Sequence, residues 1–307
     1  MPFATGGNHG LRYVKEATFG VTPANPTMRE LRHTSCSIAL TKDTFQSNEL
    51  RKDAQISDLR HGVKQVGGDV GIELSYGEYD DFLAAAIRGS WSNNILKAGT
   101  TQQYFTIERE FADIKQFELF RGCSVNTLSL DIQSNAMVTG TIGFVGKGVS
   151  FATTTAAKTQ TASYTHSPVD GFHGSLKEGG ANIAVITSIS LSIENGIEAA
   201  NIIGSDEAAA LVPGRINCTG SVSAYFENMS LLQKFVDETE SSLEITLGDG
   251  GPGSYIITLS RIKYTGGDNG LDGEGPVMLD MPFQALLNSS AGTNVQIQRI
   301  PTATTTP

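Results

Sequence analysis

The sequence carries one strand-and-helix pattern twice, and this internal repeat restricts the folds available to the chain. Residues 68–74 alternate polar and apolar side chains, as a half-buried strand does, and residues 220–226 repeat that alternation. A short helical pattern follows each strand. The apolar positions of these helices are Phe82, Leu83, Ala86 and Ile87 in the first copy and Leu231, Leu232, Phe235 and Val236 in the second. A repeated unit of this size predicts an architectural subunit that places two equivalent modules in one polypeptide.

The strand before each repeat also recurs, as Ser37–Leu40 and then as Ser188–Leu191. The offset between the copies is 151 residues at this strand, 152 at the next strand and 149 at the helix. Small changes in loop length explain that drift. Because few residues are identical, the predicted duplication depends on the pattern of polar and apolar positions.

Composition and patterning predict a mainly β (α+β) fold of two tandem modules, each with one short helix. The 34 glycines and the many Ser and Thr residues favour turns and two-residue alternation over long helices. The expected parts are an extended N-terminal arm (1–30), a first module (31–146), a connector (147–180), a second module (181–300) and a C-terminal tail (301–307). Strands are expected near 37–40, 66–75, 103–108, 116–121, 125–133, 137–145, 183–194, 215–226, 242–247, 254–264 and 276–286, and helices near 79–88 and 229–237.

A polar stretch, residues 42–65, is too long for an ordinary connection between strands. Its charges are nearly balanced, and they are Lys42, Asp43, Glu49, Arg51, Lys52, Asp53, Asp58, Arg60 and Lys64. Balanced charge of both signs suits a surface that docks on a copy of itself. A solvated hairpin is the alternative interpretation.

Acidic residues recur on the polar faces of the expected strands. They are Asp69, Glu73, Asp131, Glu194 and Asp280. Such residues are usually only solvated. In a ring, however, one polar face would line the bore, and acidic groups there would repel phosphates. The sequence alone leaves open which strand faces point inward.

A search for catalytic or metal-binding chemistry finds no convincing site. None of the five histidines has a partner at metal-ligand spacing, and no serine or cysteine has the context of a nucleophile. The glycine-rich segment 248–253 lacks the end of a phosphate loop, and the 266–275 loop departs from calcium-binding patterns at its ligand positions. We therefore expect no catalytic residue, cofactor or metal. Weak, adventitious cation binding by the 266–275 loop stays open.

Charge, cysteine use and hydropathy exclude several other classes of protein. A net charge of −10 argues against a surface that grips nucleic acid. The sequence contains no stretch long and apolar enough for membrane insertion and no secretory signal pattern. Three cysteines at unrelated spacings fit buried, reduced thiols, so we expect synthesis in a reducing cytoplasm.

Seven segments spread over nearly the whole chain carry a family resemblance through their order. They are Arg12–Pro23, Ser47–Gly62 (SNELRKDAQISDLRHG), Val66–Ile87, Arg121–Ile132, Glu178–Gly196, Val212–Asn228 and Val277–Leu286. Together they resemble the tail tube (major tail) proteins of long non-contractile-tailed bacteriophages.

This resemblance implies β-sandwich modules whose inner sheets join around a ring to form the wall of a tube. The rings stack, and the loop that reaches the neighbouring ring falls here on residues 42–65. With two modules per chain, we expect homo-oligomeric trimeric rings with pseudo-sixfold symmetry; hexameric rings are the alternative. The corresponding loop of the second copy, 194–213, is shorter, which predicts unequal stacking contacts. The implied location is the virion tail, assembled in the host cytoplasm with other tail proteins, and DNA passes through transiently and without specific binding.

Two other classes of function compete with this structural one. A β-sandwich virion decoration or carbohydrate-binding module would present clustered exposed aromatic residues, for which Trp91 is the one tryptophan available. An enzyme would need a convergent polar site, which the sequence does not reveal.

Overall fold

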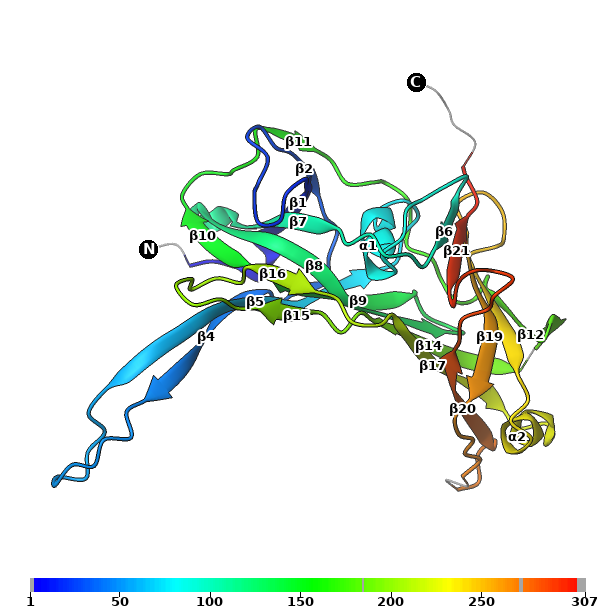
Figure 1. Ribbon diagram of the computed structural model, residues 1–307. Coiled ribbons are helices and arrows are strands. Elements are labelled where there is room, and N and C mark those ends of the chain that lie inside the picture. Colours follow the sequence, from blue (N-terminus) through cyan, green and yellow to red (C-terminus); the bar gives the residue numbers. More distant parts are fainter. Residues whose placement is uncertain (1–2, 184, 271–272, 303–307) are drawn as a thin grey trace.

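We describe the computed structural model of the chain at residues 3–183, 185–270 and 273–302. Strands dominate these residues, which also hold two short α-helices and two single-turn 3₁₀ helices. The strands form layered sheets, and one long hairpin projects from them (Figure 1). The prediction of a mainly β fold is therefore confirmed. Among the described residues, no helix is long and apolar enough to cross a membrane.

The first half of the chain forms a sheet that we call the first cover sheet, with the strand order β2–β1–β7–β8–β10. The bounds are β1 (His9–Glu16), β2 (Thr27–Glu30), β7 (Tyr104–Phe111), β8 (Gln116–Gln133) and β10 (Gly148–Ala152). A short strand, β11 (Thr159–Thr161), pairs in parallel with β2, and the 3₁₀ helices are η1 (Gly6–Asn8) and η2 (Ala112–Ile114). Alternation along β1 buries Leu11 and Tyr13 beneath this sheet.

Strand β8 passes from the first cover sheet into a second layer. Its first part pairs with β7 and β10, and its second part pairs with β9 after a register shift between Val125 and Thr127. Gly122 lies at the transition with a φ of +65°, where a Cβ would lie 2.7 Å from the Phe19 ring. A glycine is therefore required there. The second layer continues with β9 (Thr139–Gly146), β5 (Leu59–Glu73), β4 (Ala39–Gln46) and β3 (Ser35–Cys36).

The second half of the chain repeats this order of pairings. Its cover sheet runs β12–β18–β19–β21, as β1–β7–β8–β10 does, and its second layer runs β14–β17–β20–β19, as β4–β5–β9–β8 does. The bounds are β12 (Ser175–Glu178), β13 (Ala181–Asn182), β14 (Ile186–Glu194), β17 (Asn217–Tyr225), β18 (Ser241–Leu247), β19 (Tyr255–Tyr264), β20 (Met278–Ala285) and β21 (Gln296–Arg299). Strand β6 (Ile95–Lys97) of the first half adds to β21, and β15 (Glu198–Ala200) with β16 (Ala210–Val212) forms a separate small hairpin.

One pairing joins the two halves into a continuous second layer, which we call the long sheet. Ser188–Glu194 of β14 lies antiparallel to Thr127–Gln133 of β8. The long sheet therefore runs β4–β5–β9–β8–β14–β17–β20, with β3 beside β5 at the first end. It forms an arch in Figure 1, with the cover sheets on one side.

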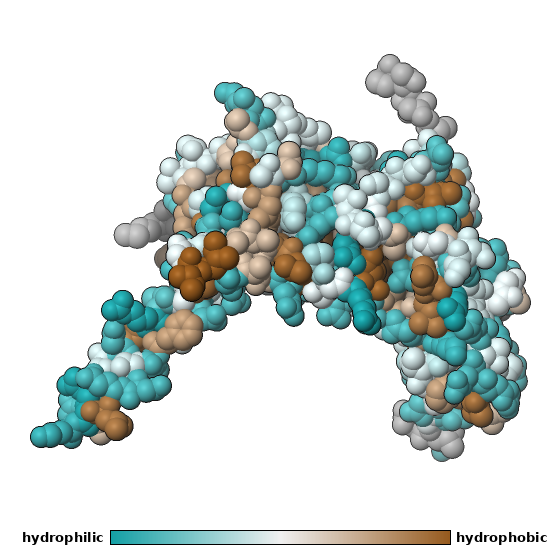
Figure 2. All heavy atoms as spheres, in the orientation of Figure 1, coloured by the Kyte–Doolittle hydropathy of each residue, from teal (hydrophilic) through white to brown (hydrophobic). Residues whose placement is uncertain are grey.

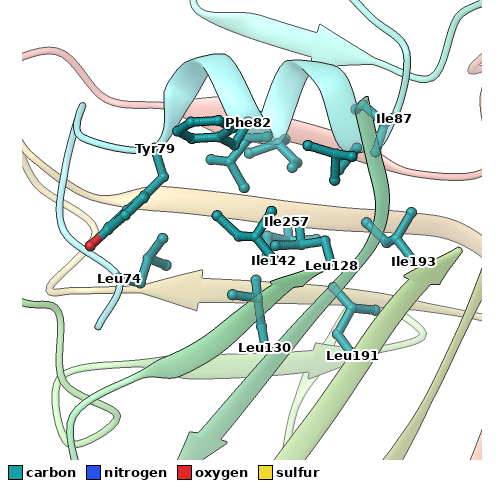
Figure 3. Packing of buried hydrophobic residues seen from close by; sticks show 14 of the residues in the cluster. Leu74, Tyr79, Phe82, Ile87, Leu128, Leu130, Ile142, Leu191, Ile193 and Ile257 are labelled. Atoms are coloured by element: carbon teal, nitrogen blue, oxygen red, sulfur yellow. The ribbon is translucent and has the colours of Figure 1, made fainter. Parts of the chain in front are cut away.

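Helix α1 (Asp80–Ala86) fills the space between the layers of the first half. Phe82 is fully buried and lies against Tyr13, Phe105 and Phe144 with ring centroids 4.6–5.6 Å apart. Burying one such side chain stabilises the fold by about 1.5–3 kcal/mol. Figure 3 shows that side chains of both halves meet beneath α1, so the core is continuous. The second helix, α2 (Ser230–Val236), has no fully buried residue.

The structure differs from the sequence prediction at the arm and the connector. The expected arm 1–30 contains β1 and β2. The sequence does not reveal β1, because flanking Gly, Pro and Asn residues mask the alternation of His9–Glu16. The expected connector 147–180 supplies β10 and β11 to the first half and β12 to the second. The strands expected at 116–121 and 125–133 are one strand, β8. Of the predicted tail, residues 303–307 lie outside the described residues.

Candidate functional site: the assembly surfaces

The five acidic residues predicted from the sequence all lie on one face of the long sheet. Residues directly opposite each other in antiparallel strands share a face. One row of such partners runs from Asp69 through Gly143 and Thr127 to Glu194. A second row contains Glu73, Thr139, Asp131 and Ser190, and a third contains Asp280, Ser223 and Ser188. The alternation of the strands places all three rows on the same side.

This face, which we call the polar face, is exposed and carries small polar side chains between the acids. Its other members include Thr141, Ser129, Ser192, Thr219, Ser221 and Gln284. No position of the polar face on the described strands β5, β9, β8, β14, β17 and β20 is Lys or Arg. Hydrophilic residues predominate along the underside of the arch in Figure 2. On these six strands the face can therefore repel a polyanion and offers no cation to hold one; the cation Lys263 lies at the edge, on β19 opposite Gln284.

Local contacts on the polar face are compact. A Cβ at Gly143 would lie 2.1 Å from the Thr127 hydroxyl and 2.9 Å from the Asp69 carboxylate, so a glycine lets these two side chains lie over β9. On β20, Asp280 accepts a hydrogen bond from Ser223 Oγ. At the edge of the sheet, Lys263 of β19 lies 3.9 Å from Glu238. The acids are thus spread over the face and do not converge on one ligand site.

The charged stretch 42–65 forms the projecting hairpin of β4 and β5 (Figure 1). Its nine predicted residues lie along the hairpin or near its base. Arg51 donates two hydrogen bonds, of 3.0 and 2.9 Å, to the Asp53 carboxylate and lowers the pKa of that carboxyl group. Arg60 pairs with Asp58 at 3.2 Å. Both pairs join residues two positions apart, so they leave the hairpin free to contact another molecule.

The hairpin also exposes apolar side chains, which the sequence reasoning missed. Phe45, Leu50, Ile56 and Leu59 are all exposed. They are scattered among the charges, so no periodicity marked them. Exposed apolar residues in a projecting element indicate a contact surface.

The shorter loop of the second half folds back on the first half. It contains β15 and β16, with Asp206 at its tip. The backbone carbonyl of Asp206 accepts a hydrogen bond from the backbone N–H of Lys64 (2.8 Å), and its carboxylate pairs with the Lys64 ammonium group (2.6 Å). The hydrogen bond from Lys64 lowers the pKa of Asp206. Glu207 pairs with Arg121 at 3.3 Å. This loop therefore supports the base of the hairpin and does not project beside it.

A polar cluster holds the second cover sheet against α1. The Tyr255 hydroxyl donates to Asp80 Oδ1 (2.5 Å) and accepts from the backbone N–H of Gly77 (2.8 Å). Burial raises the pKa of Tyr255, which keeps the hydroxyl protonated. Arg299 also pairs with Asp80 and lies 4.6 Å from the centroid of the Trp91 ring. Trp91 thus makes contacts within the chain, and its Nε1 donates a hydrogen bond to the backbone carbonyl of Asp80 (3.0 Å).

Three buried carboxylates hold loops in place, and each accepts hydrogen bonds from several donors. Glu16 accepts from Gly20, Thr106 and Gly122, and Glu78 accepts from the backbone of Arg32 and Tyr164. Glu108 accepts from Arg12, Thr155 and Ala156. Such saturation fits a structural role.

The described residues contain no cluster of three or more His, Cys, Asp or Glu side chains that could hold a metal ion. His9 and His33 bond each other at 2.8 Å, and His173 bonds Asp170 at 2.9 Å. The three cysteines are free, and burial raises the pKa of Cys218 to about 12. The glycine-rich 248–253 segment is the turn between β18 and β19. Residues 271–272 of the 266–275 loop lie outside the described residues, so the question of cation binding by this loop stays open.

Comparison with known proteins identifies the family. A family model described as Phage tail tube protein matches residues 6–285. The chain belongs to this family. It is accordingly a structural protein of the phage tail and a component of the virion, and its family is generally non-enzymatic.

No curated protein matches the chain. Among solved structures, one chain of the "Cryo-EM structure of the anti-feeding prophage (AFP) baseplate, 6-fold symmetrised" aligns at 10% identity. The alignment covers 50% of this chain and 96% of that chain, with a TM-score of 0.34.

Proposed function

We propose that this tail tube protein assembles with itself into closed rings that stack into a conduit for the phage genome, with the polar face lining the bore. One observation carries this proposal: five acids from four strands of both halves share one exposed face of a continuous sheet, and the positions of that face on β5, β9, β8, β14, β17 and β20 include no Lys or Arg. A wall that must pass DNA without retaining it needs that chemistry, because affinity for DNA comes from cations that displace its counterions.

We propose that the chain is a tandem duplication and that three copies close a pseudo-sixfold ring. The equal order of strand pairings in the two halves supports the duplication. The proposed modules are residues 31–146 and 181–300, with β1, β2 and β10 from outside these limits completing the first cover sheet and β12 completing the second. A closed barrel removes the sheet edges that would otherwise be open.

The hairpin 42–65 is proposed to contact the next ring of the stack. Its exposed apolar residues and its internally paired charges support this role over that of a solvated hairpin. Each chain then supplies one long stacking arm, because the loop 194–213 is engaged with Lys64 and Arg121 of the same chain. Stacking contacts would follow the threefold symmetry and not the pseudo-sixfold symmetry.

Negative-stain electron microscopy of the concentrated protein tests this proposal, with end-on views classified without imposed symmetry. We expect hollow rings or tubes whose class averages have threefold symmetry with six similar lobes. Sixfold averages with one chain per lobe would overturn the trimeric ring. Only compact single particles, at high concentration and in virion-like salt, would overturn self-assembly.

A further inference from the structure

The joint between the two halves is a template for a contact that the chain cannot complete alone. At the joint, β14 pairs with β8, and the second half covers α1. At the two outer edges of the long sheet, the elements that correspond to the two sides of the joint are uncovered. They are β3 and β4 at one edge, and α2 with the segment after β19 at the other. These two ends match each other as the two sides of the joint do.

The segment 265–269 is the counterpart of the second part of β8. It runs along β20, where Thr265 N bonds Pro282 O (2.8 Å) and Asp268 pairs with Asp280 through two hydrogen bonds of 3.0 and 2.8 Å. Asp268 thus lies opposite Asp280 as Ser129 lies opposite Thr141. Asp268 belongs to the polar face, and no described strand pairs with its other edge.

The segment 35–41 is the counterpart of β14. Ile38 lies against Gly68, where a Cβ would be 2.7 Å from the Ile38 backbone, and Leu191 lies opposite Gly220. Gly68 and Gly220 are equivalent in the repeat, so the strand pairings align Ala39 with Ser192. This alignment is two residues from the one that the sequence pattern of 37–40 and 188–191 favours. Ala39 is exposed.

The apolar surfaces at the two ends also correspond. Helix α2 exposes Met229 and Val236, whereas α1 is covered by Tyr255 and Arg299 of the second cover sheet. Strands β8 and β19 share a register shift, and Phe120 opposite Ile107 corresponds to Leu259 opposite Leu243. Glu118 then corresponds to Ile257, so Phe151, opposite Glu118, occupies the position of Ile297, opposite Ile257. Ile297 is buried, whereas Phe151 is 70% exposed.

We propose that a second copy of this chain repeats the internal joint across the seam between copies: segment 35–41 pairs antiparallel with segment 265–269 of its neighbour, and Phe151 packs on the neighbour's α2. Ala39 then lies opposite Asp268, as Ser192 lies opposite Ser129. The seam thus places Phe151 where Ile297 lies at the internal joint. It rests on the proposed ring and specifies how the ring closes.

The internal joint also fixes which positions can be cross-linked. Hydrogen bonds from Asn195 N to Asn126 O and from Ser134 N to Thr187 O mark the bonded positions of the ladder. Ser129 and Ser192 lie between them as a non-hydrogen-bonded pair, whose side chains are close enough for a disulfide. The equivalent pair across the seam is Ala39 and Asp268.

Cysteine cross-linking of assembled protein tests the register, in a Cys36→Ala background. The variant Ala39→Cys with Asp268→Cys should form covalent multimers after oxidation, and Ser129→Cys with Ser192→Cys should form an internal disulfide as the positive control. Thr41→Cys with Asp268→Cys should give at least tenfold less multimer, because its partners are displaced by two residues. Multimers from the Thr41 pair alone, or from neither pair in preparations that contain rings, would overturn the seam and leave the ring proposal intact. Absence of rings in every variant and in the parent protein would overturn both.

The apolar part of the seam has its own test. Phe151→Asp should reduce the assembled fraction measured by sedimentation at least tenfold, with the thermal unfolding of the unassembled protein unchanged. Phe172→Asp is the matched control, since Phe172 is 75% exposed in the bend before β12 and belongs to neither segment of the proposed seam. Equal assembly by the two variants would refute the contact between Phe151 and α2.

Discussion

Removing the hydroxyl group of Tyr255 should loosen the attachment of the second cover sheet to α1. Tyr255 is 1% exposed, and its hydroxyl bridges Asp80 and the backbone N–H of Gly77. The substitution Tyr255→Phe keeps the ring and creates no cavity. It leaves the half-buried Gly77 N–H without its acceptor, and the loss of such a partner costs up to about 1–3 kcal/mol.

The size of the effect is limited by Arg299, which continues to pair with Asp80 in the variant. The carboxylate is therefore not isolated, and the larger loss of about 3–5 kcal/mol that follows a broken buried ion pair is not expected. We predict a decrease of about 1–3 kcal/mol in the free energy of unfolding.

Urea denaturation of the unassembled protein at low concentration measures this change. Tyr225→Phe is the matched control, because Tyr225 is 48% exposed and lies on β17 away from α1. Its free energy of unfolding should change by less than about 0.5 kcal/mol. Equal stability of the two variants would show that the cluster of Tyr255 and Asp80 does not hold the halves together.

Three further predictions address the bore, the stacking arm and pH. Asp131→Lys on the polar face should make assembled tubes retain DNA at low salt and release it at high salt, whereas Glu30→Lys on the first cover sheet should not; DNA binding by neither variant would contradict the assignment of the bore. Replacing residues 47–58 with Asn-Gly should leave single rings that no longer stack in electron micrographs; tubes of normal length would contradict the role of the hairpin. Burial, together with the charge of His33, lowers the pKa of His9, so below about pH 6.5 the unfolded chain binds a proton that the folded chain does not. The free energy of unfolding should therefore fall between about pH 7 and pH 5, and His9→Gln should reduce that fall in urea denaturation; an unchanged pH dependence would contradict it.

Patterns that repeat every two residues could be read from the sequence because burial in a sheet imposes them locally. The alternation of 68–74 and 220–226 predicted β5 and β17, and it placed Asp69 and Glu73 opposite the core side of their strand. That the five acids, from four different strands, share one face required the register of pairing, which connects residues far apart in the sequence.

Other features left no local signal. Tyr255 and Asp80 are 175 residues apart, and Arg299 and Asp80 are 219 apart. No periodicity connects such residues, so the cluster that joins the halves could not be predicted. Strand β10 was assigned to a low-complexity connector because its pairing with β8, and not its composition, makes it a strand. The sequence position of the loop 194–213 corresponds to that of the hairpin, but its contacts with Lys64 and Arg121 are visible only in the structure.

A cryo-electron microscopy reconstruction of the assembled tube tests the central claim most directly, because it shows which layer of the chain faces the bore. We predict that the long sheet forms the inner wall, with Asp69, Asp131 and Glu194 directed into the lumen and the two cover sheets outside. A lumen lined by β1, β7 and β10, or by the second cover sheet, would contradict the account.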